Sequence, residues 1–166
     1  MSSAVVAIAL SGLLGYQEAR QGKVVPVERF QSPMVLDLPM VVGPTGVWTS
    51  VLRTPEERAR TRRIICDGAY VFDLTLKAGK PDRQDDVEVD GKLTLAAEHG
   101  QDKRVDVVAE IVKGDEVLAT SPKITQLKVE EDERSTRPLT FHLSGAHLKD
   151  SSALKVRLTL EVVTPP

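Results

Sequence analysis

The chain has 166 residues, of which 41% are hydrophobic and 28% are charged, and its formal net charge is -2 at pH 7. This length suits one domain with an extension rather than two independent cores. The near-neutral charge argues against a dedicated nucleic-acid-binding protein, which is usually clearly basic. A single cysteine excludes an internal disulfide and a cysteine-built metal site, and three histidines leave little material for a histidine-based one.

The first segment of the chain is apolar. Residues Ala4 to Tyr16 read AVVAIALSGLLGY. As a helix this run spans about 20 Å, which is short against a hydrocarbon core of about 30 Å. It is also a poor signal peptide, because no Lys or Arg precedes it and no small-x-small cleavage motif follows. We expect an apolar helix or anchor in residues 1–22, ending near Gly22. A buried helix or strand, a membrane or interfacial anchor, and a signal peptide all remain open.

The second segment, residues 23–52, is expected to be an extended arm. It contains Pro26, Pro33, Pro39 and Pro44. Proline lacks an N–H and forces its predecessor to be extended, so this stretch is expected to form neither a helix nor an interior strand. The residues between the prolines are largely apolar, unlike those of a flexible linker. Such an arm is expected to lie in a groove, either on its own domain or on a neighbouring subunit.

A short basic helix is predicted over residues 53–63. Thr54 can cap it, Pro55 suits the first helical position, and Glu57 completes a capping box. Its arginines are Arg53, Arg58, Arg60, Arg62 and Arg63. They are expected either to contact phosphate groups or to pair with acids elsewhere. Nucleic acid is the less favoured partner, because no aromatic residues alternate with these arginines.

Residues 64–166 are predicted to form an antiparallel β-sandwich, since the hydrophobic period changes to two. The expected inward residues fall into four groups: Phe72, Leu74 and Leu76; Leu93, Leu95 and Ala97; Val105, Val107, Ala109 and Ile111; and Val156, Leu158, Leu160 and Val162. Further strands are expected near Ile124 to Val129 and Leu139 to Leu143.

Turn-type sequences occur at Asp90-Gly91, Lys113-Gly114-Asp115 and Ser144-Gly145. About seven strands in roughly 100 residues are typical of an immunoglobulin-like or related sandwich. The Cys…Trp…Cys signature of true immunoglobulin domains is missing, so the pattern predicts an architecture and no particular family.

Few side chains suggest chemistry. An acidic run contains Asp82, Asp85, Asp86, Glu88 and Asp90. It resembles the start of a calcium loop, but Ala97 stands where that loop needs a bidentate Glu. A strand with a carboxylate face is therefore the preferred interpretation.

The remaining candidates are single residues. His142 is expected on the exposed face of a strand, whereas His99 and His147 are expected in loops. Cys66 is expected to be a small buried hydrophobe. Catalytic and nucleotide-binding motifs are absent from the sequence. We therefore expect no enzyme activity, no metal, no cofactor and no small-molecule substrate.

These patterns favour a non-enzymatic structural or accessory subunit of a larger assembly, such as a viral particle or a multi-subunit membrane complex. The alternative is a membrane-anchored or exported β-sandwich binding module, with membrane contact through residues 4–16. Partners are expected to be protein subunits, either further copies of the chain or different proteins, and an assembled or membrane-associated location is favoured. The candidate partner-binding residues are Val5, Ile8, Leu13, Leu14, Phe30, Met34, Leu36, Leu38, Met40, Trp48, Arg58 and Arg62.

Overall fold

The structure is a computed structural model that describes residues 17–19, 23–25, 27–40, 63–131 and 133–163. Strands dominate these residues. The elements are β1 (Gln17–Ala19), β2 (Lys23–Val25), β3 (Val27–Phe30), β4 (Met34–Pro39), β5 (Arg63–Cys66), β6 (Ala69–Ala78), β7 (Asp86–Ala97), β8 (Lys103–Lys113), β9 (Glu116–Thr120), β10 (Ile124–Val129), β11 (Ser135–Ser144), α2 (Gly145–Leu148), a 3-10 turn (Ser151–Ala153) and β12 (Leu154–Val163).

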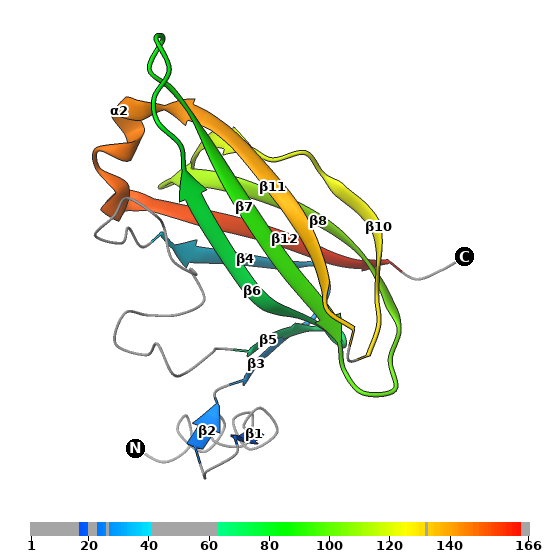
Figure 1. Ribbon diagram of the computed structural model, residues 1–166. Helices are drawn as coiled ribbons and strands as arrows, with labels where there is room; N and C mark the ends of the chain where they lie inside the picture. Colours follow the sequence, from blue (N-terminus) through cyan, green and yellow to red (C-terminus); the bar gives the residue numbers. More distant parts are fainter. Residues whose placement is uncertain (1–16, 20–22, 26, 41–62, 132, 164–166) are drawn as a thin grey trace.

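Two five-stranded sheets form the body of the protein, which we define as strands β3 to β12 (Figure 1). The first sheet has the order β10-β8-β12-β4, with β9 also paired to β8. The second has the order β11-β7-β6-β5-β3. Their strand pairs are antiparallel except β3 and β5, which run parallel. The expectation of a mainly β fold is therefore confirmed, and the two sheets form a sandwich-like arrangement.

One hydrophobic core receives side chains from both sheets. Phe141 of β11 is the largest fully buried side chain of this core. Met34 and Leu38 of β4, in the other sheet, are buried in the same core. The predicted alternation is confirmed in β8, where Val105, Val107, Ala109 and Ile111 are all buried, and in β12, where Val156, Leu158 and Leu160 are buried. One polar residue, Ser121, is buried among the described side chains; its Oγ accepts a hydrogen bond from the Thr140 N–H at 3.0 Å and so links the two sheets.

The inward face of β6 differs from the prediction at one end. The register with β7 shifts between Val71 and Asp73, which marks a β-bulge. A bulge adds one residue to one strand and so reverses the alternation on either side of it. Val71 is therefore buried, whereas Phe72 is only half-buried and lies under the guanidinium of Arg134, 3.8 Å from its ring centre. The prediction that Phe72 faces the core together with Leu74 and Leu76 is wrong.

The prediction of a turn at Asp90-Gly91 is also wrong, because β7 continues through both residues to Ala97. Gly91 pairs with Leu76 of β6 on one side and with Leu139 of β11 on the other. A Cβ added at Gly91 would lie 2.7 Å from Leu76 Cδ2 and 3.1 Å from Leu139 Cβ. This glycine is needed because its neighbours approach closely, and it does not reverse the chain.

Half of the predicted arm is part of the body. β3 and β4 are the end strands of the second and the first sheet respectively, and β4 pairs with β12 from Met34 to Pro39. Edge strands tolerate proline, so these strands agree with the expectation that the segment forms no interior strand. Of the two alternatives, residues 27–40 take the intramolecular one.

The chain crosses between the sheets near Ser32. The Ser32 N–H donates to Asp67 Oδ2 at 2.7 Å, and the Ser32 Oγ accepts from the Val162 N–H at 2.8 Å. These bonds connect the crossing segment to both sheets.

The predicted N-terminal helix is wrong for its last residues. Gln17–Ala19 is a strand that pairs antiparallel with Lys23–Val25. The rest of that helix, residues 1–16 with Gly22, lies outside the described residues. So does the predicted basic helix, except for Arg63, which begins β5. His147, expected in a loop, lies in the short helix α2, the one α-helix in the described part of the chain.

Candidate functional site

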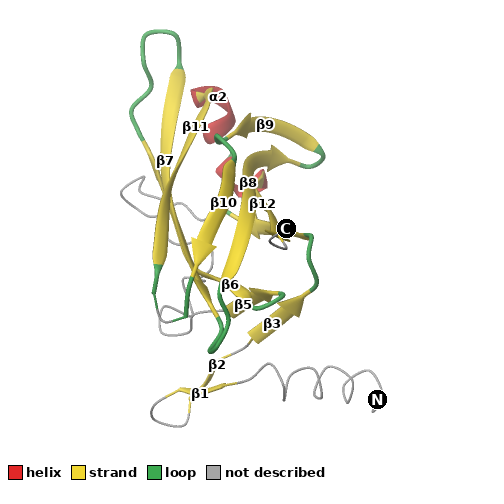
Figure 2. Ribbon diagram, turned by 90° about the vertical axis from the view of Figure 1, so that its right-hand side faces the viewer, coloured by secondary structure: helices red, strands yellow, loops and turns green. Residues whose placement is uncertain are grey.

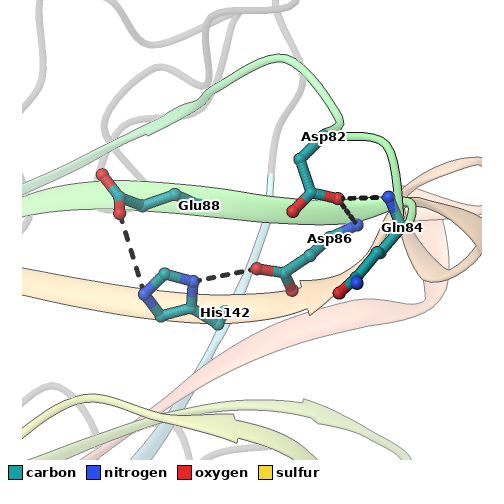
Figure 3. A network of polar contacts seen from close by, with 5 residues as sticks. All are labelled: Asp82, Gln84, Asp86, Glu88 and His142. Carbon is teal, nitrogen blue, oxygen red and sulfur yellow. Dashed lines mark hydrogen bonds and ion pairs between the residues drawn. The ribbon is translucent and has the colours of Figure 1, made fainter.

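Two surfaces of the body are candidates for a functional site. One is a polar network at one end of β7 and β11, and the other is the outer edge of β4. The network begins with His142, which lies directly opposite Glu88 in the β11–β7 register. Its Nδ1 is 3.1 Å from Asp86 Oδ2, and its Nε2 is 3.7 Å from Glu88 Oε2 (Figure 3). His142 is 57% exposed, which confirms its predicted outward position.

The neighbouring acids shape the loop between β6 and β7. Asp82 Oδ1 accepts the backbone N–H groups of Gln84 at 2.8 Å and Asp86 at 2.9 Å, as Figure 3 shows. Asp85, with a φ of 62°, accepts from Ser144 Oγ and from the Ala146 N–H, both at 3.1 Å. The Asp82 carboxylate therefore stabilises a turn, and the Asp85 carboxylate helps to cap α2. Both have a local structural role.

Chemically, this network offers negative charge on a solvated strand face, with one imidazole between two carboxylates. Among the described residues, no group of three or more His, Cys, Asp or Glu side chains could hold a metal ion. Cys66 is buried and lies far from the network, on β5. Burial raises the pKa of its thiol to about 11, so it is a protonated hydrophobe at neutral pH, as predicted.

The second surface is the outer edge of β4. The Met40 N–H donates to the Leu154 carbonyl at 3.2 Å, and the Val162 N–H points at Ser32. Because hydrogen bonds alternate along an antiparallel ladder, even-numbered residues of β4 direct their backbone groups toward β12. The backbone groups of Val35 and Asp37 therefore point away from β12, to the outside of the sheet.

The side chains of β4 alternate in the same way. Met34 and Leu38 are buried, whereas Val35 is 59% exposed and has the most exposed large hydrophobic side chain in the described part of the body. Asp37 forms a two-point ion pair with Arg157 of β12, with Nε–Oδ1 at 2.8 Å and Nη2–Oδ2 at 3.1 Å. In register, Val35 lies opposite Thr159, which lies opposite Val108, so the three form one row across the outer face.

The predicted partner-binding residues divide into two groups. Met34, Leu38 and Met40 are buried in the core of this chain, and Phe30 and Leu36 are half-buried against it. These five therefore contribute to the body's own stability. The others lie outside the described residues: Val5, Ile8, Leu13, Leu14, Trp48, Arg58 and Arg62. The sequence analysis missed the outward edge of β4, because the alternation in Met34–Pro39 shows which side chains are exposed but not which strand pairs with β4.

No protein-family model matches the chain. Comparison with curated proteins and with solved structures found no match either. Among the described helices, none has the length and apolar character needed to cross a membrane.

Proposed function

We propose that the chain is a non-enzymatic structural or accessory subunit of a larger assembly, such as a viral particle or a multi-subunit membrane complex. In this proposal the body is an antiparallel β-sandwich of the immunoglobulin-like or related type. The residues that dock it precede Val27, and the apolar side chains of Val5, Ile8, Leu13 and Leu14 supply most of the contact area.

One observation carries the proposal. β1 and β2 pair with each other and join neither sheet of the body. β3, which follows them, is an edge strand, so the chain leaves the body at its periphery, and both views draw β1 and β2 beyond β3 (Figures 1 and 2). A mainly apolar run that precedes such a peripheral pair suits attachment to another subunit, because a soluble monomer rarely exposes a large apolar patch.

The alternative is a membrane-anchored or exported β-sandwich binding module in which Ala4 to Tyr16 contacts lipid. The same apolar run favours it, and the two functions differ in what covers that run. Fractionation of cells that express the full chain separates them. Recovery in the soluble fraction without detergent contradicts an anchor, whereas recovery in the membrane fraction favours one.

The proposed docking is tested by the molar mass of the full chain in solution, measured by light scattering with and without mild detergent. We expect a defined large species without detergent. The variant Leu13→Glu should reduce this species, because a charge in an apolar interface carries a large desolvation cost. Val117→Glu is the matched control, because Val117 is 45% exposed on the body and should leave the mass unchanged.

Two results would contradict the proposal. One is a full chain that stays monomeric without detergent and that no protein partner binds through residues 1–22. The other is a large species that Leu13→Glu and Val117→Glu leave equally intact.

A further inference from the structure

The outer edge of β4 has a limited set of backbone donors. Val35 and Asp37 direct their N–H groups outward, as derived above from the hydrogen bonds of Met40 and Val162. Pro33 and Pro39 occupy the neighbouring positions of the same parity and have no N–H at all. The outer edge of β4 therefore offers an added strand two backbone N–H donors, those of Val35 and Asp37. A strand that pairs with this edge must be short.

We propose that β4 pairs antiparallel with β4 of a second copy of this chain, around a twofold axis at Val35. This contact is separate from the N-terminal docking proposed above and does not depend on it. Most soluble oligomers are symmetric, and a twofold interface uses the same patch on both subunits. β4 is itself a short strand with this donor spacing, so it suits its own edge.

Charge argues against a register centred on Asp37. If the axis passed through Asp37, two carboxylates would lie directly opposite each other, and like charges in that position destabilise a strand pair. With the axis at Val35, two β-branched side chains face each other instead, which is a favourable cross-strand pair. Asp37 is already neutralised by Arg157 of its own chain, so it adds little repulsion at the new edge.

The row of side chains that contains Val35 on the outer face gives a reason for the register centred on Val35. Val35, Thr159 and Val108 are aligned across β4, β12 and β8. Pairing at Val35 continues this row into the row of the second copy, and it covers the side chain that is 59% exposed in one chain. The first sheet would then run through both copies. A contact limited to one pair of six-residue strands is expected to be weak, so the dimer should depend on protein concentration.

The test is sedimentation equilibrium of the full chain over a concentration series, combined with amide hydrogen exchange at β4. In the dimer, the Val35 and Asp37 amides gain protection as the concentration rises, whereas the Leu36 and Leu38 amides, which face β12, are protected throughout. Val35→Lys should weaken the association by about tenfold or more, because it brings two like charges together at the axis. Val117→Lys, at the other large exposed hydrophobic residue, should have no effect.

The proposal is overturned if the Val35 and Asp37 amides exchange rapidly at every concentration. It is equally overturned if Val35→Lys and Val117→Lys associate like the unchanged chain. Exchange at these two amides reports on the β4 edge alone. A dimer at β4 and an assembly through residues 1–22 can therefore succeed or fail independently.

Discussion

Arg157 and Asp37, which are 120 residues apart in the sequence, join the last strand of the body to its outer edge. The hydrogen bond from Arg157 holds the pKa of the Asp37 carboxyl below its ordinary value of 3.8. The folded state therefore favours the ionised carboxylate more than the unfolded state does. The pair ties β4 to β12, and its contribution to stability depends on pH.

Asp37→Asn should remove that pH dependence. A carboxyl whose pKa is lowered on folding stabilises the protein above its unfolded pKa, and this stabilisation is lost as the pH falls below about 4. We expect the variant to melt slightly below the unchanged chain at pH 7, because partly exposed ion pairs contribute little. Thermal melts from pH 7 to pH 2 check this, and the two curves should converge at the acidic end. A constant difference down to pH 2 would contradict the assignment to this carboxylate.

Gly91→Ala should destabilise the body although the change adds only one methyl group. The new Cβ would approach Leu76 Cδ2 to 2.7 Å and Leu139 Cβ to 3.1 Å, so the adjoining strands must shift. Overpacking of this kind costs about 1–3 kcal/mol. Chemical denaturation measures the loss, and Lys92→Ala, at the next and exposed position of β7, is the control. An unchanged free energy of unfolding for Gly91→Ala would show that the strands are not closely packed there.

Adjacent residues of β11 should respond very differently to truncation. Phe141 is fully buried in the core, so Phe141→Ala removes a large apolar contact and should cost about 3–5 kcal/mol. His142 is on the opposite face and 57% exposed, so His142→Ala should stay within about 0.5 kcal/mol. Urea denaturation of both variants tests the assignment of the two faces of this strand. Equal losses would mean that β11 is not buried on one side as described.

Cys66 should be unreactive while the protein is folded. Burial raises the pKa of its thiol from 9.0 to about 11, and the thiolate is the form that reacts. A thiol reagent at pH 8 should label the chain only after denaturant is added. Rapid labelling of the folded chain would contradict the burial of this thiol.

The raised pKa of Cys66 also predicts that the thiol's contribution to stability is complete below pH 9 and is lost as the pH rises toward 11. The difference in the free energy of unfolding between the unchanged chain and Cys66→Ala, measured across this pH range, isolates that contribution. A difference that does not change with pH would contradict the prediction.

Local periodicity was enough to predict most of the body. The strands of Val105 to Ile111 and Val156 to Leu160 alternate strictly, because each has one face in the core and one in solvent. Two errors came from contacts between strands. The bulge near Phe72 depends on the register of β6 against β7, and Gly91 resembles a turn residue unless its neighbours on both sides are known.

The organised surfaces were harder to predict than the core. The opposition of Val35 to Thr159 and the ion pair of Arg157 with Asp37 both join residues that are more than 100 positions apart. The sequence shows that β4 alternates, but it cannot show which strand accepts its backbone groups or which side remains outward. The polar network of His142 and Asp86 has the same origin, since the residues meet only through the pairing of β11 with β7.

The pairing of β4 with β12 also affects how the chain is made. β4 is among the first strands of the body to leave the ribosome, yet its one partner among the described strands is the last to be synthesised. Met34 and Leu38 therefore cannot pair with Leu160 and Val156 until these residues have left the ribosome. Until then, their backbone groups and apolar side chains lack the partners that β12 provides. Topologies rich in such distant contacts fold slowly, and unpaired strand edges are prone to aggregation. Chains truncated before residue 154 should thus depend on chaperones, whereas the full chain, once released from the ribosome, should not.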